Sequence, residues 1–188
     1  MVKKAGEKTG QFGLWLTEYI RENHSTQGYQ VYYDHGDSRL HDNVAVIKGF
    51  LGDTVTSKNK LTDVDVMVAN QNHEVLLLIE IEESPLSPKT LLGDVFASLF
   101  CTRFAVKEAG EQKYFSVTPH THMIIAGFIP RNNEPSNKLI NKIHTRLREF
   151  SGPDNNISSE NVDFVIDDDL DTCIRNLKDI VNKILKEN

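Results

Sequence analysis

The sequence has few of the features that mark secreted, membrane-bound and metal-thiolate proteins. It has only two cysteines in 188 residues, Cys101 and Cys173, and their spacing fits no metal site or redox motif. We therefore expect both to be reduced and structural. The longest apolar run, Val75–Ile79, is far too short to span a bilayer. Met1–Lys4 lead into a polar stretch rather than the apolar core of a signal peptide. These absences predict a cytoplasmic protein with no membrane partner.

The sequence also lacks a basic excess, internal repeats and low-complexity tracts. Lys and Arg number 21 against 27 Asp and Glu, which gives a net charge of −6. Proteins that coat nucleic acid usually carry a positive excess, so that class is disfavoured. A nucleic-acid enzyme is not excluded, because an acidic active site adds to the deficit and is offset once metal ions bind. Since no linker divides the chain, we expect a single domain over 1–188.

Hydrophobic periodicity predicts a chain of alternating helices and strands. Apolar residues recur at helical spacing in four segments: 11–24, 88–108, 137–150 and 170–186. Strand patterns cover 29–34, 61–69, 75–82, 123–129 and 162–166, with a less regular extended segment at 44–55. Segments 61–69 and 75–82 are joined by a short polar turn and should form a hairpin. A meander followed by a crossover helix and a further strand predicts an α/β fold with a mixed sheet flanked by helices.

Acidic residues gather at one end of this predicted hairpin. Glu80 and Glu82 directly follow an aliphatic run, and Asp63 and Asp65 lie on the preceding arm. Residues two apart in a strand point to the same face, roughly 7 Å apart, so each pair shares a face. Buried carboxylates are unfavourable unless something compensates them. Hard divalent cations such as Mg²⁺ prefer oxygen ligands, and such an ion could polarise a phosphoryl oxygen and supply hydroxide.

Two short stretches of the hairpin resemble a known catalytic motif. Residues 62–68, TDVDVMV, followed by 78–82, LIEIE, look like the PD-(D/E)xK nuclease motif of the restriction-endonuclease-like superfamily. In that family an Asp lies on one strand and Glu-x-Lys on the next, within a helix–three strands–helix–strand core. The element order here is similar. The resemblance implies a restriction-endonuclease-like core over about 11–130, with an extra C-terminal helix, strand and helix over 131–188.

The resemblance implies a role for each acidic residue of the motif. Asp65 and Glu80 would bind Mg²⁺ or Mn²⁺, with the carbonyl of Ile81 as a further ligand. Asp63 is the alternative to Asp65, because neither follows the proline that is usual in the family. Glu82 stands where the family usually has lysine. It would position or deprotonate the attacking water, or help to hold the metal.

Positive charge has to come from elsewhere in the chain. Lys89, early in the helix at 88–108, is the candidate for the charge that the motif lysine usually supplies. Three basic residues recur every four positions on the helix at 137–150: Lys138, Lys142 and Arg146. This stripe could follow a phosphate backbone. A solvated helix face explains it equally well.

The leading hypothesis is a metal-dependent nuclease that hydrolyses phosphodiester bonds, with DNA endonuclease as the expected activity. Cutting both strands of a duplex commonly needs two active sites, so a homodimer is an expected state. One alternative is a catalytically inactive member of the same fold that binds nucleic acid or protein, which the missing lysine favours. Another is an acidic cation-binding or interaction protein unrelated to nucleases. In that case, cation binding would survive the loss of Asp65 and Glu80.

Overall fold

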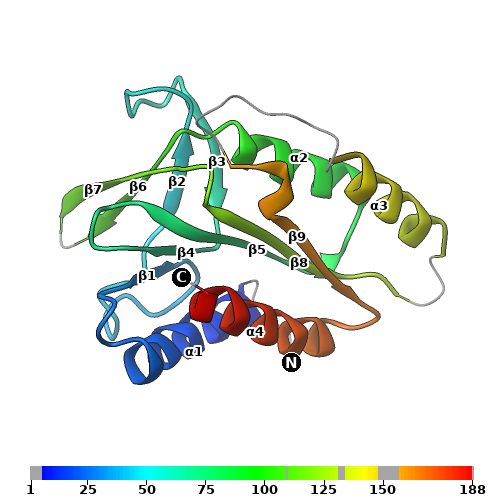
Figure 1. Cartoon of the computed structure of the whole chain (residues 1–188), viewed down its shortest axis with the longest axis horizontal. Coiled ribbons are helices and arrows are strands. Elements are labelled where there is room, and N and C mark those ends of the chain that lie inside the picture. Colours follow the sequence, from blue (N-terminus) through cyan, green and yellow to red (C-terminus); the bar gives the residue numbers. More distant parts are fainter. Residues whose placement is uncertain (1–5, 109, 131–133, 148–156, 188) are drawn as a thin grey trace.

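The structure, a computed structural model, describes residues 6–108, 110–130, 134–147 and 157–187, and is a mixed α/β fold with two sheets (Figure 1). The helices are α1 (Glu7–Asn23), α2 (Pro88–Leu99), α3 (Glu134–Leu147) and α4 (Leu170–Glu187), with a 3₁₀ turn, η1 (Ser159–Asn161). The five-stranded sheet has the order β1 (Gln30–Tyr33), β4 (Val66–Ala69), β5 (Val75–Pro85), β8 (His122–Phe128), β9 (Val162–Asp167). The four-stranded sheet has the order β3 (Lys60–Val64), β2 (Ile47–Phe50), β6 (Arg103–Glu108), β7 (Glu111–Ser116).

The five-stranded sheet is the centre of the molecule. β4 runs antiparallel to both β1 and β5, whereas β5, β8 and β9 are parallel to one another. Parallel neighbours need crossover connections, and α2 and α3 lie within those connections. α1 and α4 cover one face of this sheet, and α2 and α3 lie on the other (Figure 1). The predicted mixed sheet flanked by helices is confirmed, as is the C-terminal helix, strand and helix.

The predicted hairpin is also confirmed, but only for the part of its first arm that forms β4. β4 and β5 pair antiparallel, with Val66 opposite Ile79 and Val68 opposite Leu77. β5 is buried on both faces, because Leu77 and Ile79 pack toward α1 and α4 while Leu78 packs toward α2. The same alternation, continued past Ile79, places Glu80 and Glu82 on the α2 side of the sheet and Glu83 on the opposite side.

The four-stranded sheet was not predicted, and it corrects one expected strand. Segment 61–69 is two strands rather than one: β3 belongs to the four-stranded sheet and β4 to the five-stranded sheet. Asp65 lies at the break between them. The chain changes sheets at this point, so residues on either side of Asp65 continue in different ladders.

The expected helix at 88–108 is wrong beyond Leu99. α2 begins as predicted, with Ser87 accepting a hydrogen bond from the Thr90 N–H at 3.1 Å. The chain then leaves the helix at Phe100, and β6 and β7 form a hairpin. Phe104 lies four residues after Phe100, which imitates helical spacing. However, residues 104–106 are all buried, and their backbone groups pair with β2 and β7.

The remaining expectations concern the C-terminal half and the cysteines. α3 begins at Glu134, slightly earlier than expected, and the predicted helix end at 148–150 lies outside the described residues. Both cysteines are buried and free of disulfides, as expected. Within the described part of the chain, no helix combines the length and apolar character needed to cross a membrane.

Candidate metal centre

The predicted acidic residues meet in a hollow of about 260 Å³ beside the end of β5. We call it the acidic hollow. It is lined by Asp63, Asp65, Glu80, Ile81, Glu82, Thr90, Asp94 and Ile125. These residues come from β3, the break after β3, β5, α2 and β8, so the hollow lies where the two sheets and α2 meet. Every acid predicted as a ligand or catalytic residue is among them.

Asp65 is held in place by backbone bonds on both sides. Its carbonyl oxygen accepts the Asp34 N–H at 2.9 Å, and its Oδ2 accepts the Ile81 N–H at 2.7 Å. Because Val66 pairs with Ile79, Asp65 continues the ladder to lie beside Glu80. The second carboxylate oxygen, Oδ1, accepts no hydrogen bond from the described residues. That oxygen is therefore available to a ligand.

Three carboxyl groups of the acidic hollow, those of Asp65, Glu80 and Asp94, have raised pKa values. Burial raises the pKa of Asp65 to about 6, against the opposing effect of the Ile81 N–H. Burial, followed by the charges of Asp65 and Asp94, raises the pKa of Glu80 well above its usual range. Burial and the charge of Glu82 raise the pKa of Asp94 to about 6. Closely spaced carboxyls with restricted access to water favour either a shared proton or a cation.

The two glutamates that follow Ile81 have different surroundings. Glu82 lines the acidic hollow, and its Oε1 accepts the Ser84 N–H at 3.0 Å and the Ser84 hydroxyl. Glu83 points to the opposite face and accepts the Thr9 N–H at 2.8 Å, in the first turn of α1. The N-cap of α1 is Gly6, which has no side chain to offer. Glu83 supplies that cap from a distant strand and lies outside the acidic hollow.

The donor set suits a cation that keeps part of its water shell. Among the described residues, no three His, Cys, Asp or Glu side chains are placed to hold one metal ion as they stand. Asp65 and Glu80 are nevertheless neighbours, and Ile81 lines the same hollow. Mg²⁺ is usually bound by one or two carboxylates, with water completing its coordination. Two carboxylates and one backbone carbonyl are therefore sufficient protein ligands.

The structure does not bring Lys89 into this group. Lys89 is exposed in the first turn of α2 and does not line the acidic hollow. Lys60 lies closer to the acidic hollow, because its Nζ is 2.5 Å from Oδ2 of Asp63, and Asp63 lines the hollow. The sequence offered no reason to single out Lys60, since residues three apart in a regular strand point to opposite faces. In β3 the register with β2 is irregular between Lys60 and Thr62.

Asp94 is the site residue that sequence reasoning missed. It lies on α2 rather than on the predicted hairpin, so the pattern of strand acids did not include it. A signal was present: Thr90 and Asp94 lie four residues apart on the predicted helix and therefore share a face. Both line the acidic hollow. Polar residues four apart beside the apolar face of a helix that follows an acidic strand would have identified the pair.

The predicted basic stripe lies away from the acidic hollow. Lys138, Lys142 and Arg146 are exposed on α3. Lys142 and Arg146 border a mostly apolar groove between α2 and α3, together with Leu92 and Phe96. The stripe therefore does not join the acidic residues directly, and its contact with a phosphate backbone stays a prediction.

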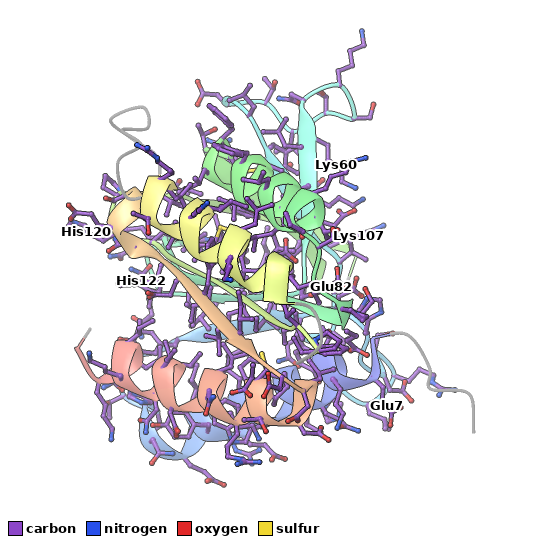
Figure 2. All side chains as sticks on the ribbon, turned by 90° about the vertical axis from the view of Figure 1, so that its right-hand side faces the viewer. Glu7, Lys60, Glu82, Lys107, His120 and His122 are labelled. Atoms are coloured by element: carbon purple, nitrogen blue, oxygen red, sulfur yellow. The ribbon has the colours of Figure 1, made fainter. Side chains whose placement is uncertain are left out.

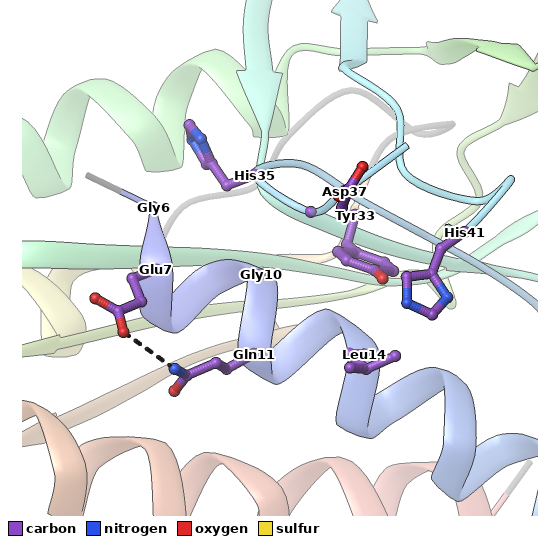
Figure 3. Close-up of a pocket in the computed structure, with 10 residues that line it drawn as sticks. Gly6, Glu7, Gly10, Gln11, Leu14, Tyr33, His35, Asp37 and His41 are labelled. Carbon is purple, nitrogen blue, oxygen red and sulfur yellow. Dashed lines mark hydrogen bonds between the residues drawn. The ribbon is translucent and has the colours of Figure 1, made fainter. Parts of the chain in front are cut away.

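A larger hollow, of about 650 Å³, lies beside α1 (Figure 3). His35 and His41 lie on opposite sides of Tyr33 there, above the first turns of α1. It lacks a group of shielded carboxyls, so it does not offer the chemistry of the acidic hollow. His35 lines this larger hollow but also influences the acidic hollow, because its charge opposes the effect of burial on the pKa of Asp65. Its backbone is left-handed (φ 62°), which is uncommon for a residue with a side chain.

Comparisons with protein-family models, with curated proteins and with solved structures found no match for this chain. The chemistry of the acidic hollow is therefore argued from its own residues. It offers paired carboxylates for a hard cation, two further acids for proton transfer, and a lysine at its edge.

Proposed function

We propose that this protein is a metal-dependent nuclease that hydrolyses phosphodiester bonds in DNA with Mg²⁺ or Mn²⁺. The carrying observation is that Asp65 and Glu80 meet in one hollow and that burial raises the pKa of both. Groups with strongly shifted pKa values that cluster in a hollow are typical of functional sites. The order α1, β1, β4, β5, α2, β8 supports the resemblance to a restriction-endonuclease-like core, once the intervening strands of the four-stranded sheet, β2, β3, β6 and β7, are set aside.

Asp65, Glu80 and the carbonyl of Ile81 would hold the metal ion. Such an ion polarises a phosphoryl oxygen and lowers the pKa of a bound water. The hydrogen bond from the Ile81 N–H fixes Oδ2 of Asp65, so Oδ1 would be the oxygen that binds the ion. The charge of the ion would also lower the pKa values of both carboxyl groups, because it would stabilise them in their ionised form.

Glu82 and Asp94 are placed to handle the proton of the attacking water. Ser84 holds Oε1 of Glu82, which orients the second oxygen of that carboxylate. Asp94, with a pKa of about 6, lies close enough to Glu82 for their charges to interact. A carboxylate with a pKa near the working pH is an efficient general base. The pair can therefore accept the proton as hydroxide forms and release it afterwards.

Lys60 is the better-placed source of positive charge for the developing phosphorane. Its ion pair with Asp63 holds the ammonium group at the edge of the acidic hollow. A fixed cation near developing negative charge lowers the barrier of phosphoryl transfer. Lys89, exposed on α2, would have to reach across from outside the lining residues.

The second candidate function is a non-catalytic member of the same fold that binds nucleic acid. The replacement of the motif lysine by Glu82 favours it, as does the lack, among the described residues, of three acids placed for one ion. A cation-binding protein unrelated to nucleases is disfavoured by the shielded proton-transfer pair, since simple cation binding does not need it.

Cleavage of defined substrates tests the proposal. Purified protein is incubated with plasmid, linear duplex and single-stranded DNA, in Mg²⁺, Mn²⁺ or EDTA. We expect cleavage that requires the metal and is lost in Asp65→Asn and Glu80→Gln. Glu111→Gln, at the exposed first position of β7, is the matched control and should cut as the wild type does. Metal-independent cleavage, or full activity in Asp65→Asn, would reject the proposal. Binding without cleavage by the wild type would support the non-catalytic alternative.

A further inference from the structure

The four-stranded sheet turns one face to the core and the other outward. Ile47, Val64 and Phe104 belong to the core around α2. Side chains alternate along a strand, so the positions between them point away from the core. Along β2, β6 and β7 these outward positions include Lys48, Arg103, Lys107, Gln112 and Tyr114, which we call the outer face. Lys48 and Lys107 are exposed, and the side chain of Tyr114 is 44% exposed.

The outer face of β2, β6 and β7 is positively charged, although the chain as a whole is acidic. On the neighbouring strand β3, Asp63 lies opposite Lys48 and forms an ion pair with Lys60. Neither Lys48 nor Lys107 forms an ion pair with a described residue. Arg103 donates to the backbone carbonyl of Asp53 at 2.9 Å, a bond that leaves its charge uncompensated. With a net charge of −6, the chain would be expected to present acids rather than cations on an average surface. The concentration of cations on one sheet face therefore points to an anionic partner.

The outer face adjoins the acidic hollow at strand β3. Lys48 lies opposite Asp63 in the β2–β3 ladder, and Asp63 lines the hollow. Lys60 forms the ion pair with Asp63 at the boundary. Lys60, Lys107 and Glu82 all lie toward the same side of the molecule in Figure 2. An anionic chain lying on the outer face would therefore pass the entrance of the hollow.

We propose that the outer face binds the phosphate backbone of duplex DNA and leads the scissile strand to the acidic hollow. This inference rests on the proposed nuclease function and adds the surface that holds its substrate. Lysine and arginine contacts to phosphates give affinity without reading sequence. Tyr114 is the one exposed aromatic residue on the outer face, because Phe50, which shares that face opposite Arg103, is buried. Proteins that bind single strands stack successive bases on several rings, so the composition favours a duplex.

The spacing on the outer face fits separate phosphate contacts. Lys48 lies opposite Ala105 in the β2–β6 ladder, and Lys107 follows two residues later on the same face. Diagonal neighbours of this kind are about 7–8 Å apart, so the two lysines can bind two different phosphates. On duplex DNA, each phosphate that a cation neutralises contributes about 0.9 to the slope of log Kobs against log salt. Replacing one such lysine by a neutral residue should lower the slope by that amount.

Fluorescence anisotropy with a labelled duplex, in EDTA to prevent cleavage, tests this surface. The variant is Lys48→Gln/Lys107→Gln. The control is Lys183→Gln/Lys186→Gln, which removes the same charge from exposed positions of α4, on the other face of the five-stranded sheet. We expect the variant to bind about 10- to 100-fold more weakly at 0.1 M salt, with a slope lower by about 1.8. The control should match the wild type.

The outcomes separate this inference from the proposed function. Unchanged affinity and slope in the variant would overturn the outer face while leaving cleavage untouched. Equal weakening in variant and control would also overturn it, because net charge alone would then explain the effect. Tighter binding to single-stranded DNA than to the duplex would reject the duplex as partner. If the wild type binds DNA but does not cut plasmid in Mg²⁺, the nuclease proposal fails, and the lowered slope still supports the outer face.

Discussion

The stability of metal-free Asp65→Asn, measured relative to the wild type, should rise with pH. Burial raises the pKa of Asp65 from the ordinary 3.8 to about 6, so ionised Asp65 is less favourable in the folded state than in the unfolded state. The wild type therefore keeps this part of its stability below about pH 4 and loses it as the pH rises through 6. Asparagine carries no charge at any pH, and its side-chain oxygen still accepts the Ile81 N–H.

The size of the effect follows from the shift. A difference of about two pKa units corresponds to about 3 kcal/mol once the group is ionised in both states. The destabilisation is about 0.5 kcal/mol at pH 4 and reaches about 3 kcal/mol at pH 8. The stability of Asp65→Asn relative to the wild type should therefore rise by about 2.5 kcal/mol over this range. Any fixed difference between the two side chains cancels in that comparison.

Urea unfolding of both proteins in EDTA, at pH 4 and pH 8, measures this difference. Addition of Mg²⁺ at pH 8 provides the second arm. A ligand at ten times its Kd stabilises the native state by about 1.4 kcal/mol, and Asp65→Asn should not show this gain. A stability difference that stays constant with pH would refute the reasoning, because it would mean that Asp65 ionises equally easily in the folded and unfolded states.

Three further predictions concern catalysis and binding. Glu82→Gln should keep metal binding but cut DNA about 10²–10⁴-fold more slowly, because glutamine cannot accept the proton of the attacking water; wild-type rates would move that role to another acid. Lys60→Gln should reduce the rate of plasmid cleavage more than Lys89→Gln does, and the reverse order would restore Lys89 as the source of positive charge. Replacing the three basic residues of α3, Lys138, Lys142 and Arg146, by glutamine should lower the salt slope of duplex binding by about 0.9 for each phosphate that these side chains neutralise. An unchanged slope would identify a solvated helix face.

The hairpin and its acids could be predicted from the sequence because their information is local. The aliphatic run before Glu80 requires a buried strand, and period-two alternation then fixes which acids share a face. The polar turn after Ala69 predicts the antiparallel partner, and the register confirms it. What brings Asp65 beside Glu80 is therefore present in about twenty residues of sequence.

The four-stranded sheet could not be predicted in the same way. β6 begins soon after α2, and Phe100 and Phe104 continue a helical spacing into a segment that is a strand. Only the pairing with β2, about fifty positions earlier, distinguishes the two. The division at Asp65 is equally non-local, since nothing in the alternation of 61–69 shows that its halves join different sheets. Lys60 enters the site through such long-range pairing, because β3 joins the four-stranded sheet beside β2.

Calorimetric titration of the metal-free protein with Mn²⁺ tests the central claim most directly. If Asp65 and Glu80 form a metal centre, the wild type should bind the ion, and Glu80→Gln should lose that binding. Because both carboxyls have raised pKa values, binding near pH 6 should also release protons, so the measured heat should depend on the ionisation enthalpy of the buffer. No binding by the wild type, or equal binding by Glu80→Gln, would contradict the account.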